Sequence, residues 1–257
     1  MKPLIVVVND DGIEAAGLAA AARAAARHGD VLVVAPHVQQ TSMARAYPRT
    51  AEMGIVDEVD FDLGEETVKA FAVHSSPAYA AAHAILELAP RRPDLLVSGI
   101  NMGGNLGRSI TCSGTLGACM EADSEGVPSI ALSLETPADV IRKSTLGADL
   151  FRYAEETADF WIGKVLTEGM PRDCNILNVN VPAEPVGPEN YRITRMDPQN
   201  YYWLLPPGKR DMAKPFELEF QIRWDEETLL PDGDIKAVCV DRIISVTPLG
   251  WDLTLEP

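Results

Sequence analysis

The sequence has few cysteines, and none of them are paired at a metal-binding spacing. The four cysteines, at positions 112, 119, 174 and 239, contain no CxxC motif. This spacing argues against both a zinc framework and a dense disulfide scaffold. We therefore expect four buried, reduced thiols, as is usual in cytosolic proteins.

Long apolar runs are also lacking. The run Leu4–Val8 stops at Asn9, whereas a secretory leader needs ~7–15 apolar residues and a membrane span needs ~20. We expect a cytoplasmic protein with no membrane association.

Basic residues are scarce as well. Lys and Arg number 22 against 38 Asp and Glu, which gives a net charge of −16. Binding to a nucleic acid polymer through its phosphates needs clustered positive charge, so no such partner is expected, and an anionic membrane surface is equally disfavoured. An anionic substrate has to be attracted locally, by a metal ion, a helix N-terminus or backbone amides.

What the chain does contain is enough apolar material for one large core, with 46% hydrophobic residues in 257. A strand at Leu4–Val8, an Ala-rich helix at 15–27 and a strand at Val31–Ala35 form a βαβ unit, which is typical of a doubly wound sheet. Further strands are expected within 51–73, at 94–98, 129–134 and 175–181, and helices at 77–88, 116–123 and 138–166. We predict a three-layer α/β/α fold with a mostly parallel, mixed sheet.

The pattern of the sequence changes after Pro182, from helix-like to extended segments. Residues 190–225 are expected to form an extended, β-rich arm, and residues 236–247 short strands. The prediction is a single domain over 1–257, with the arm serving oligomerisation because a lone hairpin is marginal in water.

Three segments carry candidate chemistry. Asn9-Asp10-Asp11-Gly12 follows the first strand, where it indicates either a hard-cation site or a simple turn. A loop over 99–107 holds four glycines with Asn101 and Asn105, and its spacing fits neither a P-loop nor a dinucleotide fingerprint. Ser113-Gly114-Thr115 opens a predicted helix, as an anion site or an N-cap.

Together these segments resemble the SurE survival-protein family, whose members are divalent-metal-dependent nucleotidases and phosphatases. The resemblance covers nearly the whole chain in order. Its motifs are Val8–Gly12, Val33–Pro36, Asp94–Asn101, Asn105–Gly107, Ser113–Thr115 with Ala118, Met120 and Glu121, Ile176–Pro182, Ser245–Leu249 and Asp252–Thr254.

The resemblance implies one Mg²⁺ or Mn²⁺ ion per subunit. Its ligands are expected to be Asp10, Asp11, Asn101 and a hydroxyl, which is Thr41 by position or Ser42 after a small shift of the loop. Asp10 and Asp11 are also the expected catalytic residues. Attack on phosphorus by water is preferred over attack by a carboxylate, because one carboxylate is already committed to the metal.

The implied substrate is a nucleoside 5′-monophosphate, with 3′-monophosphates as a further option. Its phosphate is expected to rest on Ser113, Gly114 and Thr115, with Asn9 and Asn105 orienting the site. Alternatives are a broad-specificity phosphomonoesterase and a non-catalytic nucleotide-binding module.

Two departures from the family pattern affect these expectations. Ser75–Ala80 replaces the usual Gly-Thr-Pro-x-Asp-Cys beside the expected nucleoside pocket, and the preceding His74 is a candidate substrate contact. The family usually continues into a final helix exchanged between subunits, whereas this sequence ends at Pro257. A homodimer or homotetramer is therefore expected to use the 190–225 arm.

Overall fold

The computed structural model describes residues 1–64, 66–141, 148–171 and 174–252. Within them, nine strands form one sheet in the order β3-β4-β2-β1-β5-β6-β7-β11-β8. These strands are β1 (Leu4–Val8), β2 (Asp30–Pro36), β3 (Val56–Asp62), β4 (Thr67–Val73), β5 (Leu95–Met102), β6 (Ser129–Leu134), β7 (Ile176–Val181), β8 (Tyr191–Ile193) and β11 (Ile244–Leu249). Most neighbours run parallel, while β3–β4 and β7–β11 are antiparallel. The predicted mixed sheet is therefore confirmed.

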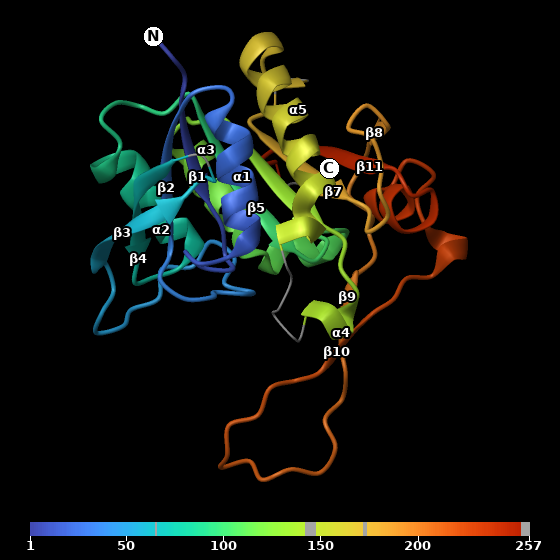
Figure 1. The fold of residues 1–257 in the computed structure, drawn as a ribbon. Coiled ribbons are helices and arrows are strands. Elements are labelled where there is room, and N and C mark those ends of the chain that lie inside the picture. Colours follow the sequence, from blue (N-terminus) through green and yellow to red (C-terminus); the bar gives the residue numbers. More distant parts are fainter. Residues whose placement is uncertain (65, 142–147, 172–173, 253–257) are drawn as a thin grey trace.

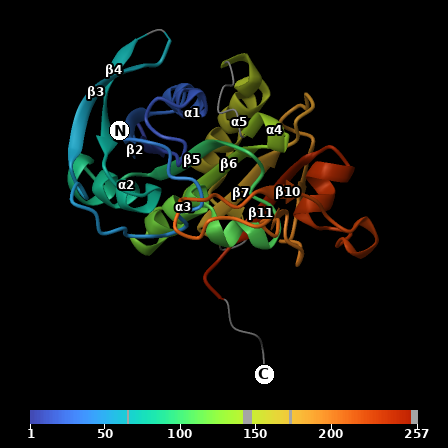
Figure 2. The same ribbon diagram turned by 90° about the horizontal axis from the view of Figure 1, so that it is seen from below.

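Helices cover both faces of the sheet (Figure 1, Figure 2). Helices α1 (Ala16–Ala26) and α5 (Arg152–Glu168) contribute to the apolar core on one face, and α2 (Pro77–His83) and α3 (Gly114–Ser124) to the core on the other. Shorter helical segments are α4 (Ala138–Ile141), 3₁₀ turns at Arg108–Cys112, Ala148–Phe151 and Glu226–Thr228, and π-helical turns at Ala84–Leu88 and Lys236–Val240. The three-layer α/β/α prediction is confirmed.

Small side chains let α1 lie close to the sheet. A Cβ on Gly17 would lie 2.0 Å from the carbonyl oxygen of Ile100, so only glycine permits this approach of α1 to β5. On its outer side, α1 is tied to α5 because Arg23 and Arg27 bind Glu155 at 2.7 and 2.6 Å. These contacts fix α1 against β5, whose end contributes to the site described below.

One predicted strand boundary and one predicted element type were wrong. The strand expected to end at residue 98 continues to Met102, because β5 resumes pairing with β6 after a bulge that follows Ser98. Gly99 permits the bulge, since its φ is +140° and a Cβ there would lie 2.3 Å from the carbonyl oxygen of Leu132. Residues 236–240, expected to be a strand, are helical instead. Ile235, Val238 and Cys239 follow the helical spacing i, i+3, i+4 and belong to a small separate core.

The expected arm is smaller than 190–225. Residues 191–193 form β8 at the edge of the main sheet, and the separate ribbon consists of β9 (Tyr202–Leu204) and β10 (Phe220–Ile222). Residues 205–219 join these two strands and extend away from the body of the protein (Figure 1). Part of the helix expected over 138–166, and part of the Asp252–Thr254 motif, lie outside the described residues.

All four cysteines are reduced thiols, as predicted, and three of them are buried. Cys112 is exposed, so the expectation that all four are buried was wrong. Cys112 ends a 3₁₀ turn directly before the start of α3. Among the described residues, no helix has the length and apolar character needed to span a membrane.

Candidate functional site

The three candidate segments meet at the carboxyl ends of β1 and β5. These strands are parallel neighbours, and Val8 lies opposite Ser98 in their register. The chain crosses to β2 on one side of β1 and later returns to place β5 on the other side. Ligands of open α/β sheets bind at such a switch point, because the loops that leave the two strands diverge there.

The turn after β1 is built by Asn9. Its Nδ2 donates to the carbonyl oxygen of Gly12 at 3.0 Å, and its Oδ1 accepts from the N–H of Gly12 at 3.2 Å. Gly12 has a φ of +98°, which only glycine adopts readily. Both amide atoms of Asn9 therefore shape the turn that presents Asp10 and Asp11, and its expected part in orienting phosphate stays a prediction.

Asp10 faces the start of α3. Its Oδ1 accepts a 2.8 Å hydrogen bond from the hydroxyl of Thr115, and its carboxyl is buried. Burial, followed by the neighbouring charge of Asp11, raises the pKa of Asp10 to about 7, against the lowering effect of Thr115. A Cβ added to Gly114 would lie 2.8 Å from the Asp10 Cβ, so α3 approaches Asp10 closely only because residue 114 is glycine.

Asp11 faces the other way, toward β5. Its Oδ2 accepts from the N–H of Met102 and its Oδ1 from the amide of Gln39, each at 3.2 Å. Burial raises the pKa of Asp11 as well. A cavity of about 210 Å³ opens beside Asp11, lined on its far side by α1 residues and Phe151. The two carboxylates thus contact different elements, Asp10 the start of α3 and Asp11 the end of β5.

Asn101 and Asn105 differ in how they are held. Asn101 donates its Nδ2 to the carbonyl oxygen of Gly103 at 2.7 Å, and its amide oxygen is the atom suited to bind a cation. Asn105 donates to the hydroxyls of Thr115 and Ser133, at 3.2 and 2.9 Å. Asn105 therefore orients Thr115, and through it Asp10.

The side chains that hydrogen-bond to the backbone of Asn105 were not predicted from the sequence. Asn178 and Asn180, both buried on β7, donate to its carbonyl oxygen at 2.9 and 3.1 Å, and the Asn180 side chain also accepts from its N–H at 2.8 Å. The available signal was the pattern Asn-Val-Asn in a fully buried strand, because buried amides need partners.

The start of α3 shows the predicted N-cap, while its role as an anion site stays a prediction. Ser113 caps the helix, since its Oγ accepts from the N–H of Leu116 at 3.1 Å. The hydroxyl of Thr115 is directed at Asp10 instead. The first turn of α3 contains no acidic residue. The positive end of the helix dipole beside the carboxylates is therefore not neutralised within the helix. This end of α3 is a suitable position for a phosphate.

The loop with Thr41 and Ser42 is anchored on both sides of the site. The N–H of Gln40 donates to the carbonyl oxygen of Asp10 at 2.7 Å, and the N–H of Ala44 donates to that of Cys112 at 3.1 Å. Thr41 and Ser42 are exposed between these anchors, and Ser42 has a φ of +63°. Either hydroxyl lies on the segment that bridges β1 and α3.

The departing segment Ser75–Ala80 also borders the site. Ser76 caps α2 by accepting from the N–H of Tyr79. The ring of Pro77 lies 3.0 Å from the position of a Cβ on Gly114. The Tyr202 hydroxyl lies 2.7 Å from the position of a Cβ on Gly103. Tyr202 therefore packs on the glycine loop, as does its buried neighbour Tyr201, rather than standing free as a stacking surface.

The donor atoms fit a hard divalent cation. Two carboxylates, an amide oxygen and a nearby hydroxyl are the oxygen ligands that Mg²⁺ and Mn²⁺ prefer. Burial and mutual repulsion raise the pKa of Asp10, and a cation offsets both effects because it stabilises the ionised pair.

Carboxylates at a switch point, next to a helix N-terminus rich in hydroxyls and amides, define an oxygen-lined site of the kind that binds cations and phosphates in doubly wound α/β proteins. The sequence model of the family described as survival protein SurE matches residues 5–202. The chain belongs to the SurE family.

Relatives named 5′-nucleotidase SurE match over most of their length. The protein from Methanothermobacter thermautotrophicus is 39% identical over 78% of this chain and 81% of its own. That from Sorangium cellulosum is 35% identical over 98% and 92%. Among solved structures, the Sure protein from Aquifex aeolicus matches with a TM-score of 0.72 and 28% identity, over 98% of this chain and 95% of that one.

Proposed function

We propose that the chain hydrolyses nucleoside 5′-monophosphates to nucleosides and inorganic phosphate, using a divalent cation held at Asp10 and Asp11. The observation that carries this proposal is the 2.8 Å hydrogen bond from Thr115 to Asp10, which joins the expected metal-binding turn to the expected phosphate-binding helix end. The proposal is further supported by the name 5′-nucleotidase SurE of the relatives.

The ligands proposed for Mg²⁺ or Mn²⁺ are Asp10, Asp11, the amide oxygen of Asn101 and the hydroxyl of Thr41 or Ser42. When bound, such an ion neutralises phosphate charge and lowers the pKa of water. The N–H groups of Gly114 and Thr115, with the hydroxyl of Ser113, stabilise the charge that develops on the phosphoryl oxygens. Asn105 donates to the Thr115 hydroxyl and so keeps it directed at Asp10.

Two routes of attack on phosphorus remain open in this proposal. In the preferred route a water molecule attacks and a carboxylate of the pair takes its proton; in the other a carboxylate attacks directly. A chiral thiophosphate ester distinguishes them, because one in-line displacement inverts phosphorus and two restore its configuration. Inversion supports attack by water, and retention supports a carboxylate nucleophile.

The test of the function itself is phosphate release from AMP and GMP. We expect release that is abolished by EDTA and restored by Mn²⁺ or Mg²⁺. Binding of AMP in calorimetry without phosphate release would favour the non-catalytic alternative. No release from any nucleoside 5′-monophosphate or 3′-monophosphate would contradict the proposed activity.

A broad-specificity phosphomonoesterase is the second candidate. It is favoured because the ring of Pro77, in the segment that departs from the family pattern, lies 3.0 Å from the position of a Cβ on Gly114, a residue of the proposed phosphate site. Comparing kcat/KM for AMP, sugar phosphates and p-nitrophenyl phosphate separates the two functions. A clear preference for AMP supports the nucleotidase, and equal rates support the broader enzyme.

Assembly and location stay predictions. We propose a homodimer or homotetramer in which the β9–β10 ribbon contacts another subunit, since Leu204, Met212 and Phe216 expose apolar side chains along it. Deleting residues 206–218 and measuring the mass in solution tests this arrangement. The cytoplasmic location expected from the sequence is tested by fractionation of the source cells.

A further inference from the structure

Two histidines that the sequence keeps far apart are brought together at the edge of the sheet. His37 directly follows β2 and His74 directly follows β4. These strands are parallel and pair through Pro36 and Val73, so both rings leave the sheet at the same level. The ring centroids are 4.3 Å apart and the rings are nearly parallel, at 28°.

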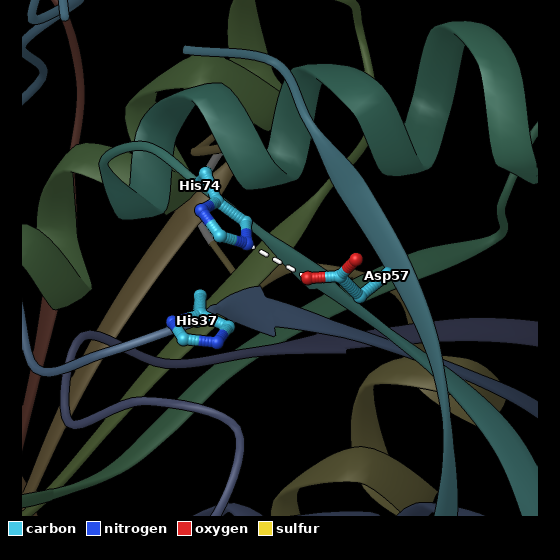
Figure 3. Close-up of side chains that lie close together, drawn as sticks. All are labelled: His37, Asp57 and His74. Atoms are coloured by element: carbon cyan, nitrogen blue, oxygen red, sulfur yellow. Dashed lines mark hydrogen bonds and ion pairs between the residues drawn. The ribbon is translucent and has the colours of Figure 1, made fainter. Parts of the chain in front are cut away.

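A carboxylate completes this group. Asp57 lies on β3, which pairs with β4 in antiparallel register, and its Oδ2 accepts from Nε2 of His74 at 2.7 Å (Figure 3). One ligand atom from each of His37, Asp57 and His74 lies within 4.8 Å of the others. In the described part of the chain this is the sole group of three such side chains with this proximity.

We propose that His37, Asp57 and His74 form a second metal site, which binds Zn²⁺ or a chemically similar transition-metal ion and is separate from the Asp10–Asp11 site. Two imidazoles and one carboxylate are ligands that Zn²⁺ prefers, whereas Mg²⁺ prefers oxygen alone. The fourth position of a tetrahedral site stays open to water. This inference does not depend on the proposed phosphatase activity.

The outer contacts of His74 suit a metal ligand. Its Nδ1 lies 3.4 Å from a carboxylate oxygen of Glu52. Histidines that bind a metal through one ring nitrogen usually donate the other N–H to a carboxylate, which fixes the tautomer. Glu52 therefore orients Nε2 of His74 toward the ion, which takes the place of the proton now shared with Asp57.

Backbone hydrogen bonds fix the main-chain positions of His37 and His74, while the side chains of the group can turn. The N–H of His37 donates to the carbonyl oxygen of Val73, and that of His74 to Ile55, each at 2.9 Å. Zn²⁺ ligand atoms at about 2.0–2.1 Å from the ion lie about 3.4 Å from one another. The 2.7 Å separation of His74 Nε2 and Asp57 Oδ2 therefore has to open slightly, and the widest separation in the group, at most 4.8 Å, has to close. His37 is exposed and the Asp57 side chain is 49% exposed, so both side chains have room to turn.

The experiment uses the full chain, stripped of metal by a chelator, in the variant Asp10→Asn/Asp11→Asn. This variant removes the oxygen-ligand site and leaves the histidines intact. Calorimetry with Zn²⁺ should show one ion bound per chain. Adding His37→Ala or His74→Ala to this background should lower the affinity at least ~10-fold. Co²⁺ should give the visible absorption of a four-coordinate nitrogen and oxygen site, and excess Mg²⁺ should not compete.

His28→Ala is the matched control. His28 also hydrogen-bonds a carboxylate through Nε2, that of Asp159 at 2.8 Å, but it belongs to no group of three metal-binding side chains among the described residues. Its replacement should leave Zn²⁺ affinity unchanged. If His74→Ala does not fold, as judged by circular dichroism, His74→Gln and Asp57→Asn take its place. No Zn²⁺ binding in the Asp10→Asn/Asp11→Asn chain, or binding that none of the His37, Asp57 and His74 substitutions weakens, would overturn the proposal.

Discussion

The hydroxyl of Thr115 donates a 2.8 Å hydrogen bond to Oδ1 of Asp10, although the two residues are 105 positions apart. This buried bond connects the turn after β1 to the first turn of α3. Asn105 donates to the same hydroxyl, so Thr115 is held on both sides. Asp10, Thr115 and Asn105 thus form a single chain of hydrogen bonds, from which the first prediction follows.

Thr115→Val should lower kcat at least ~10-fold, because the isosteric valine leaves the Asp10 carboxyl without its donor and frees the Asn105 amide. Steady-state phosphate release measures the loss. Thr157→Val is the matched control, since that buried hydroxyl bonds the Tyr153 carbonyl within α5. Equal kcat in Thr115→Val and the wild type would show that the Thr115 hydroxyl has no part in catalysis.

Asp11→Asn should reduce both metal affinity and turnover by at least ~10²-fold, because a charged hard ligand becomes neutral. Titration of the stripped protein with Mn²⁺, followed by activity at each concentration, measures both effects. Asp30→Asn removes a carboxylate at the opposite end of the sheet, where β2 begins, and should change neither. Unchanged turnover in Asp11→Asn would remove Asp11 from the site.

Gly114→Ala should lower activity at least ~10-fold and destabilise the fold by about 1–3 kcal/mol. The added methyl would lie 2.8 Å from the Asp10 Cβ and 3.0 Å from Pro77, so α3 has to move away from the carboxylate. Denaturant unfolding and phosphate release provide the two readouts. At Gly208, apart from its chain neighbours, no atom of the described residues lies within 4 Å of the corresponding position, so Gly208→Ala should leave both unchanged. A Gly114→Ala enzyme with full activity contradicts this close approach.

The stability of the metal-free protein should fall as the pH rises from about 4 to about 7. Burial raises the pKa of Asp10 from 3.8 to about 7, so over this range the folded chain keeps a proton that the unfolded chain has released. The protonated Asp10 carboxyl therefore contributes its full stabilisation below pH 4, and this contribution is lost as the pH rises through 7. Asp10→Asn should flatten this dependence, by up to about 4 kcal/mol between pH 4 and pH 8. Urea unfolding at both pH values measures it, and identical profiles for the two proteins would count against the raised pKa.

The hydroxyl ligand is decided by comparing Thr41→Val with Ser42→Ala. Both residues lie on the segment anchored at Asp10 and Cys112, and both are exposed. Loss of the true ligand should raise the Mn²⁺ concentration for half-maximal activity at least ~10-fold, whereas the other substitution serves as its control. If neither changes the metal requirement, the loop supplies no ligand.

The predicted parts of the site were those encoded by local patterns. Asp10 and Asp11 follow a buried strand, and Ser113 opens a helix, so short segments were enough to place them at strand and helix ends. The continuation of β5 to Met102 was missed because a glycine-rich segment resembles a loop. The helical turn at 236–240 was missed because short apolar runs do not distinguish strands from helices.

By itself, the sequence determined the α/β class, the succession of the main strands along the chain, and the family. These depend on hydrophobic periodicity and on motifs a few residues long. Only the tertiary structure decided which side chains meet. Asn178 and Asn180 support Asn105, and His37 lies against His74, because the register between strands aligns residues that are far apart in the chain. Such contacts leave no periodic signal in a single sequence, since each partner alone is an ordinary polar residue at the end or the centre of a strand.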